Sequence, residues 1–171
     1  MTPDMFYRAI NKSEPSLIRT EADELTYPLH ILIRYEIEKM MFDGKVSVDD
    51  LPELWNAKYK EYLGVDVPDD THGILQDMHW SDGSFGYFPS YALGSAYGAQ
   101  ILDTMTKTVD VYGAVSRGDI TPVSNWLHDR IWQYGCARTP ERLLKDCVGA
   151  EFDPHFYTNY LKNKFRAVYG I

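Results

Sequence analysis

Apolar residues recur at three- and four-residue spacing through most of the chain, a pattern typical of amphipathic helices. The longest such segment is predicted to run from about Glu21 to Phe42 and to end at Gly44. Its apolar positions are Leu25, Leu29, Leu32, Ile33, Ile37, Met40 and Met41. Pro28 lies inside this segment, and proline lacks the amide hydrogen that a helix interior needs. We therefore expect Pro28 either to kink the helix or to begin a new one.

Further helices are predicted from local start signals. The acidic segment 47–50 precedes a helix that closes at Gly64. Pro122, Pro140 and Pro154 each follow a threonine or an aspartate, which is typical of a helix start. The remaining helices are predicted at about 70–78, 89–107, 109–116, 122–134, 140–148 and 154–169. No segment alternates like a strand, so the sequence predicts an all-α fold.

Small residues dominate the segment 89–107, which indicates that its backbone packs closely against a neighbour. No repeat, linker or low-complexity tract interrupts the 171 residues. We therefore expect residues 1–171 to form a single helical domain with no internal boundary. A hydrophobic fraction of 44% with 25% charged residues is that of a folded domain.

The charge of the chain excludes some partners. The net charge of −8 disfavours nucleic acid and anionic membranes as partners. No apolar run is long enough to span a membrane, and residues 1–10 lack the features of a signal peptide, so we expect a cytoplasmic location. In that reducing compartment Cys136 and Cys147 are expected to be free thiols.

Two segments carry candidate chemistry. In the first, Arg19 and Asp23 are four residues apart at a helix entry, so the carboxylate is expected to orient the guanidinium for binding another carboxylate. The alternative is an ordinary surface ion pair. The second segment places Gln76, Asp77, His79 and Trp80 just before a glycine turn. So dense a polar and aromatic set is an unusual way to fill a core.

Tyr87 and Tyr91 follow near the start of the next helix, where their hydroxyls are able to donate hydrogen bonds to an anionic centre. The alternative is that both are buried tyrosines with local hydrogen bonds. None of the five histidines has a second histidine or cysteine at a zinc-ligand spacing, so a complete zinc site is absent from the sequence.

Two motifs in these segments resemble those of a known family. Ile18–Asp23 matches I-R-x-x-A-D, and Gly73–Trp80 matches G-x-x-Q-D-x-H-W, of the thermostable zinc carboxypeptidase family of Taq type. Both motifs are complete and in family order, and the resemblance extends from about Asp4 to Ile171. It implies the all-α architecture of the angiotensin-converting-enzyme-like and neurolysin-like metallopeptidases.

The resemblance also implies that part of the enzyme is missing. Family members hold zinc with the histidines of His-Glu-x-x-His and a glutamate of a following motif, and these motifs do not occur here. The chain thus resembles the C-terminal third of a zinc-dependent metallocarboxypeptidase, which removes single residues from peptide C-termini. Zinc is implied for the full-length parent and no cofactor for this chain, which alone is expected to be inactive.

The resemblance implies roles for the candidate residues. Arg19 is expected to bind the C-terminal carboxylate of the peptide substrate, with Asp23 orienting it. His79 and one of the two tyrosines, Tyr87 or Tyr91, are expected to face the oxyanion of the reacting carbonyl. The spacing does not choose between the tyrosines. The remaining motif residues are expected to support the site or line its cleft: Gln76, Asp77 and Trp80.

A rival interpretation is a free-standing, non-catalytic helical module that binds a partner protein through an aromatic-rich face, including Trp55, Trp126, Trp132 and the tyrosines. A carbohydrate-binding protein with stacked aromatics is a third interpretation, supported by composition alone. If the chain is part of an enzyme, its uncovered apolar surface is expected to pair with a second copy, and intact family members commonly form homodimers.

Overall fold

The computed structural model describes residues 1–171 and is all-helical, which confirms the predicted fold class. No helix is long and apolar enough to cross a membrane. The α-helices are α1 (Pro3–Ile10), α2 (Tyr27–Phe42), α3 (Leu51–Leu63), α4 (Pro89–Thr106), α5 (Val111–Ser116), α6 (Thr121–Arg130), α7 (Pro140–Val148) and α8 (His155–Tyr169). The short 3-10 helices are η1 (Arg19–Glu21), η2 (Ile74–Gln76) and η3 (Trp132–Tyr134).

The contacts within the chain divide it into two compact units. The first comprises residues 1–93 and 163–171, and the second comprises residues 94–162. The divisions fall inside α4 and α8, which run through them as continuous helices. The expectation of a single domain stays a prediction.

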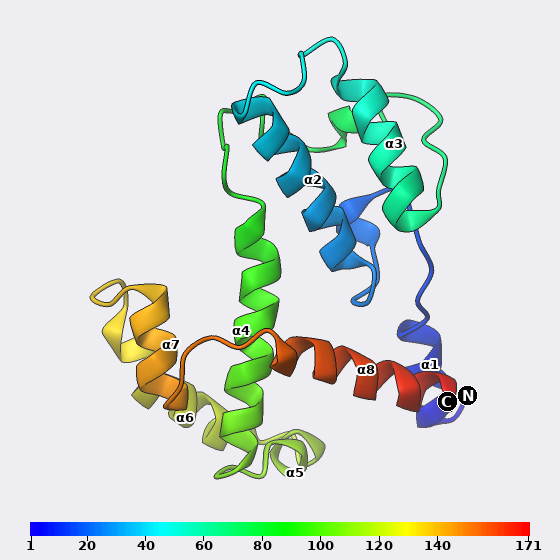
Figure 1. Ribbon diagram of the computed structural model, residues 1–171. Helices are drawn as coiled ribbons and strands as arrows, with labels where there is room; N and C mark the ends of the chain where they lie inside the picture. Colours follow the sequence, from blue (N-terminus) through cyan, green and yellow to red (C-terminus); the bar gives the residue numbers. More distant parts are fainter. The chain divides into compact units, whose positions relative to one another are not determined.

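In the first unit α2 and α3 lie side by side (Figure 1). Their facing sides form a core of Ile33, Ile37, Leu51, Trp55, Tyr59 and Leu63. Helix α3 ends as predicted at Gly64, whose φ of 72° is a conformation that glycine adopts easily. Helix α2 begins at Tyr27, with Pro28 in its first turn, rather than at Glu21. Pro28 therefore begins the helix, because a missing amide hydrogen costs nothing there.

The segment between α3 and α4 has less helix than the sequence predicts. Instead of a helix over residues 70–78, only η2 forms. Gly73 lies close to its neighbours, since a Cβ atom there would lie 2.9 Å from a methyl group of Val67 and 3.1 Å from the Asp69 carbonyl oxygen. The residues after η2 leave the helical conformation at Asp77, whose φ and ψ are −114° and 144°. This extended conformation sends the side chains of the motif toward α2.

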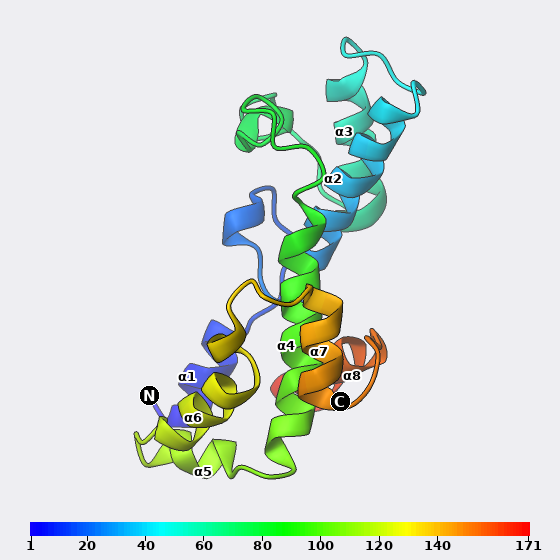
Figure 2. The same ribbon diagram turned by 90° about the vertical axis from the view of Figure 1, so that its left-hand side faces the viewer.

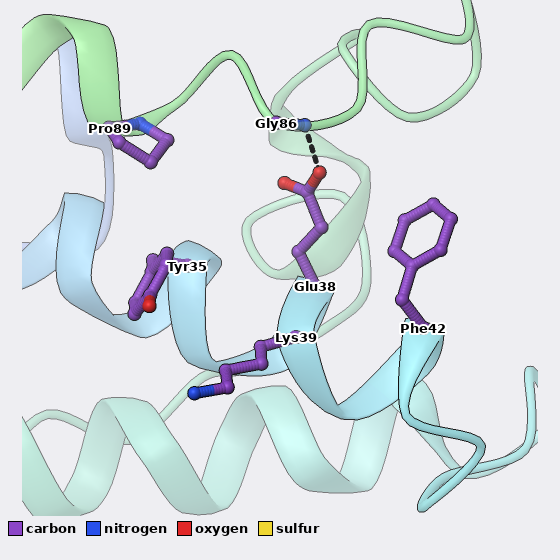
Figure 3. Close-up of a pocket in the computed structure, with 6 residues that line it drawn as sticks. All are labelled: Tyr35, Glu38, Lys39, Phe42, Gly86 and Pro89. Carbon is purple, nitrogen blue, oxygen red and sulfur yellow. Dashed lines mark hydrogen bonds between the residues drawn. The ribbon is translucent and has the colours of Figure 1, made fainter.

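A buried carboxylate on α2 anchors the end of this segment. Glu38 accepts hydrogen bonds from the Gly86 amide and, over 3.4 Å, from the Trp80 indole. Beside this contact lies an open pocket of about 260 Å³ (Figure 3). Its lining residues are Tyr35, Glu38, Lys39, Phe42, Gly86 and Pro89. None of the residues singled out in the sequence lines it.

The two ends of the chain meet in the first unit. Helix α1, which the sequence interpretation did not include, is capped by Thr2, whose side chain accepts from the Met5 amide over 3.2 Å. Arg8 donates to the Val168 carbonyl over 2.8 Å. The Tyr169 hydroxyl accepts from the Ser13 amide over 2.8 Å. These bonds join the first residues of the chain to the end of α8.

In the second unit α6 contacts both α5 and α7 (Figure 2). Its core is formed by Met105, Val111, Trp126 and Cys147. Both cysteines are free thiols, as expected. The close packing expected at the small residues of α4 is wrong for Gly94 and Gly98, because nothing lies within 4 Å of a Cβ built at either position. The buried positions of α4 are instead Ala96, Gln100 and Met105.

Candidate functional site

Arg19 lies buried at the start of η1 and reaches across to the second motif. Its Nη2 donates to Asp77 Oδ1 over 2.6 Å, and its Nε donates to the same carboxylate over 3.1 and 3.3 Å. Its Nη1 donates to the Tyr27 hydroxyl over 3.2 Å, and its backbone amide donates to the Gln76 side chain over 3.0 Å. Two nitrogen atoms of the guanidinium therefore donate to one carboxylate, an arrangement that fixes the orientation of both groups.

A second arginine, Arg34 on α2, holds the same carboxylate from the other side. Its Nε donates to Asp77 Oδ2 over 2.6 Å. Its Nη2 donates to Gln76 Oε1 over 2.9 Å. Asp77 thus lies between two buried guanidinium groups, with 10% of its own side chain exposed.

His79 and Tyr91 are in contact with each other and lie beside Arg19. The Nε2 atom of His79 is hydrogen-bonded to the Tyr91 hydroxyl over 3.0 Å, and its Nδ1 lies 3.9 Å from Asp77 Oδ1. The Arg19 guanidinium lies 5.0 Å from the centre of the Tyr91 ring, within the range of a cation–π contact. The structure therefore brings Arg19 of the first motif together with Asp77, His79 and Tyr91, which lie 58 or more residues further along the chain.

Aromatic side chains surround these polar groups. The Tyr87 ring stacks on His79 with 6.0 Å between ring centres, and the Tyr87 side chain remains half exposed. Trp80 packs edge-on against both Trp55 and Phe88. Phe88 is buried and lies 4.3 Å from the His79 ring centre. His79 is therefore held between a buried phenyl ring and a half-exposed phenol ring.

The charges of the cluster are set by burial and by the two arginines. Burial opposes ionisation of Asp77, but hydrogen bonds and charges from Arg19 and Arg34 hold the pKa of this carboxyl below its ordinary value. His30, one helical turn before Arg34 on α2, is fully buried. Burial, together with the positive charges of Arg34 and Arg19, lowers the pKa of His30 to about 4. At neutral pH Arg19 and Arg34 are therefore cationic and Asp77 is anionic, while the imidazole of His30 is neutral.

The predicted pairing of Arg19 with Asp23 is wrong. Helix η1 ends at Glu21 and Ala22 is extended, so the two side chains do not share a helix face. The Asp23 carboxylate instead accepts from the amides of Leu25 and Thr26 over 2.9 and 3.0 Å. It also accepts from Ser13 Oγ, the Glu14 amide and Thr26 Oγ1. Asp23 therefore fixes the turn that leads into α2, and Asp77 is the carboxylate that orients Arg19.

The sequence interpretation missed the polar residues of α2. His30, Arg34 and Glu38 recur every four residues and are 0%, 0% and 7% exposed. Each faces the motif segment or the core of the first unit rather than solvent. Their signal was present in the sequence, because polar residues at a spacing of four form a stripe along one face of a helix. The apolar positions of the same helix obscured that second stripe.

No group of three or more His, Cys, Asp or Glu side chains in the structure is arranged to hold a metal ion. Asp77 is engaged by two arginines, and Nε2 of His79 is hydrogen-bonded to Tyr91. What the cluster presents instead is a guanidinium, an imidazole and phenol groups, which together suit an anionic or polarised oxygen.

Comparison with known proteins identifies the family. The family described as Carboxypeptidase Taq (M32) metallopeptidase matches residues 1–165 of the chain. The chain belongs to this family. Among similar proteins, Carboxypeptidase 1 of Bacillus subtilis strain 168 is 50% identical over 167 residues, which are 97% of this chain and 33% of that protein. Thermostable carboxypeptidase 1 of Thermus thermophilus is 42% identical over 166 residues, which are 96% of this chain and 32% of that protein.

Solved structures of the M32 family agree with the fold. The crystal structure of an M32 carboxypeptidase from Deinococcus radiodurans R1 matches with a TM-score of 0.95 and 36% sequence identity. The match covers 100% of this chain and 35% of that chain. The chain therefore spans about a third of the length of the M32 proteins that it matches.

Proposed function

We propose that the chain is the C-terminal third of a zinc-dependent metallocarboxypeptidase, a hydrolase that releases single residues from peptide C-termini. The observation that carries the proposal is the meeting of Arg19 and His79 at Asp77 and Tyr91. The two M32 motifs are widely separated along the chain, yet their polar groups occupy one cluster. An enzyme that removes a terminal residue has to recognise a free carboxylate and stabilise a charged carbonyl oxygen, and this cluster offers a group for each task.

In this proposal Arg19 binds the C-terminal carboxylate of the peptide. Three of the five N–H groups of an arginine are engaged by Asp77 and Tyr27 here, which leaves two for a ligand. Asp77 and Gln76 orient the guanidinium, while Trp80 supports the wall of the cleft. Asp23 acts through the turn before α2 rather than through Arg19 itself.

Tyr91 is the better candidate for the phenolic group that donates to the reacting carbonyl oxygen. Its hydroxyl lies 3.0 Å from His79 Nε2, so the two groups are close enough to serve one oxygen atom. Tyr87 is half exposed and contacts His79 through its ring rather than its hydroxyl. We assign Tyr87 to the rim of the site, where it covers the imidazole.

Zinc is proposed as the metal of the full-length protein, with its ligands outside these 171 residues. The part that we propose for the side chains of this chain is to bind and orient the peptide and to donate hydrogen bonds, in keeping with the lack of a group of three or more metal-ligating side chains among them. We propose a cytoplasmic location, in keeping with the two free thiols.

The rival interpretation, a non-catalytic binding module, has less support. Trp55 and Trp126 are 1% and 6% exposed, so two of the three tryptophans of its proposed face belong to the cores. The family match over residues 1–165 also accounts for the motif residues, which a binding module has no need for.

The test is an assay of the full-length protein by mass spectrometry on two matched peptides, one with a free C-terminal carboxylate and one amidated. We expect release of one residue at a time from the free peptide, loss of activity with a chelator, and recovery when zinc is returned. The 171-residue chain alone is the negative control. Equal cleavage of both peptides, or activity that a chelator does not change, contradicts the proposal.

A further inference from the structure

Arg34 is the most completely engaged polar side chain of the cluster. It is 0% exposed. Besides its bonds to Asp77 and Gln76, its Nη1 donates to the His30 carbonyl over 2.8 Å and to the Tyr59 hydroxyl over 3.1 Å. Its guanidinium lies 4.6 Å from the centre of the Trp55 ring, in the core. Because it is buried on every side, Arg34 does not itself meet a substrate.

Arg34 is hydrogen-bonded to the two side chains, Asp77 and Gln76, that also accept hydrogen bonds from Arg19. Asp77 Oδ2 accepts from Arg34 over 2.6 Å, and Asp77 Oδ1 accepts from Arg19 over 2.6 Å. Gln76 Oε1 accepts from Arg34 over 2.9 Å and from the Arg19 backbone amide over 3.0 Å. Arg34 on α2 therefore helps to fix the position of both the side chain and the main chain of Arg19.

The sharing of one carboxylate by two arginines also sets the net charge of the group formed by Arg19, Arg34 and Asp77. A single arginine paired with Asp77 forms a neutral unit, which attracts an anion weakly. With Arg34 present, two guanidinium groups share one carboxylate, and the unit keeps one positive charge. Glu38, the other buried carboxylate on α2, accepts from Gly86 and Trp80 instead. A buried positive charge is poorly screened by water and therefore favours an anionic partner strongly.

We propose that Arg34 is a positioning residue for carboxylate recognition, which holds Asp77 and Gln76 so that Arg19 stays oriented and its charge is not neutralised. The identity of the ligand, the terminal carboxylate of a peptide, rests on the proposed function. The part played by Arg34 within the cluster rests on the contacts alone. Arg19 touches the ligand, and Arg34 acts through Asp77 and Gln76.

The test compares Arg34→Gln and Arg34→Lys in the full-length protein, with Lys39→Gln as the matched control. Lys39 lies on the same helix, is exposed, and makes no contact with the cluster. For the peptide with a free carboxylate we expect Arg34→Gln to raise KM at least 10-fold, with a smaller change in kcat. Arg34→Lys keeps the charge but loses the fork, so its KM is expected to lie between those of the wild type and Arg34→Gln.

A merely structural role for Arg34 predicts a different result. It would lower the fraction of active protein while leaving KM and the preference for a free over an amidated peptide unchanged. That outcome, with KM within twofold of the wild type, overturns the proposal. If Arg34→Gln does not fold, Arg34→Lys carries the same test, and an unchanged KM in that variant is equally decisive.

A second measurement separates this proposal from the proposed function. In the 171-residue chain with carbon-13-labelled aspartate, NMR follows the titration of the Asp77 carboxyl. We expect Arg34→Gln to move its midpoint to higher pH and Lys39→Gln to leave it unchanged. If the full-length protein shows no carboxypeptidase activity, the proposed function fails while this titration still tests Arg34. An unmoved Asp77 midpoint overturns the role of Arg34 whatever the activity.

Discussion

Arg19 Nη2 donates to Asp77 Oδ1 over 2.6 Å, across 58 residues of sequence. This bond joins one M32 motif to the other, because Arg19 belongs to the first and Asp77 to the second. Both partners are buried, with side chains 8% and 10% exposed. The pair is therefore much less screened than an ion pair at the surface, and its loss has consequences both for folding and for the site.

Replacing Asp77 by Asn is expected to destabilise the chain strongly. The substitution leaves Arg19 and Arg34 buried without their shared counter-charge, a change that typically costs about 3–5 kcal/mol. Unfolding of the 171-residue chain in urea measures the loss, with Asp49→Asn, an exposed residue, as control. A loss below about 1 kcal/mol contradicts the view that the two arginines depend on this carboxylate.

Arg19→Gln in the full-length protein is expected to weaken recognition of the terminal carboxylate. A hydrogen bond to a charged group contributes about 1.5–3 kcal/mol, so KM for a free peptide is expected to rise roughly 10- to 100-fold. The amidated peptide serves as an internal control, because it lacks the carboxylate that Arg19 is proposed to bind. Equal losses for both peptides would mean that Arg19 supports the fold and does not bind the substrate.

The two tyrosines are distinguished by single removal of each hydroxyl. We expect Tyr91→Phe to reduce kcat by roughly 10² to 10³, the usual effect of losing an oxyanion donor. Tyr87→Phe keeps the ring that stacks on His79 and is expected to change kcat by less than threefold. The reverse order would transfer the donor role to Tyr87. Circular dichroism of both variants checks that the helices are retained.

The exposed side of α1 predicts self-association of the isolated chain. Met5, Phe6 and Ile10 on this helix are 57%, 55% and 63% exposed, and Phe6 and Ile10, four residues apart, share one helix face. We propose that a second copy covers them, since exposed apolar surface favours pairing. Light scattering is expected to show a mass that rises with concentration, and Met5→Ser with Phe6→Ser is expected to abolish the rise. A strict monomer at high concentration contradicts this prediction.

The helical fold follows from local signals that the sequence carries openly. Helix α7 begins at Pro140 and α3 ends at Gly64 as expected, because a proline start and a glycine stop act within a few residues. The same reasoning fits α1, where Thr2 and Pro3 form the start signal found at the later helices. The start of α1 is therefore readable from the sequence as well.

The hydrogen-bond partners within the site, unlike the helix boundaries, do not follow from local sequence signals. The bond of Arg19 to Asp77 instead of Asp23 depends on where η1 ends and on how the segment after η2 returns to α2. Spacing along the chain does not encode that return. The motif resemblance named Arg19, Asp77 and His79, yet the buried Arg34 had no motif to mark it. Only the packing of α2 against the motif segment reveals that both arginines share one carboxylate.

His30 predicts a loss of stability in mild acid. Its pKa is lowered to about 4 in the folded chain, whereas in an unfolded chain an imidazole titrates near pH 6.5. The unfolded state therefore binds the extra proton first, and stability falls as the pH drops from about 6.5 toward 4. From this group alone we expect the free energy of unfolding to be about 2 kcal/mol lower at pH 4.5 than at pH 7. His30→Gln, which does not titrate, is expected to remove that difference, and the exposed His155→Gln is expected to keep it. Urea unfolding at the two pH values measures the free energy of unfolding of each chain. An equal difference between pH 7 and pH 4.5 in the wild type and in His30→Gln would show that His30 is not the group responsible.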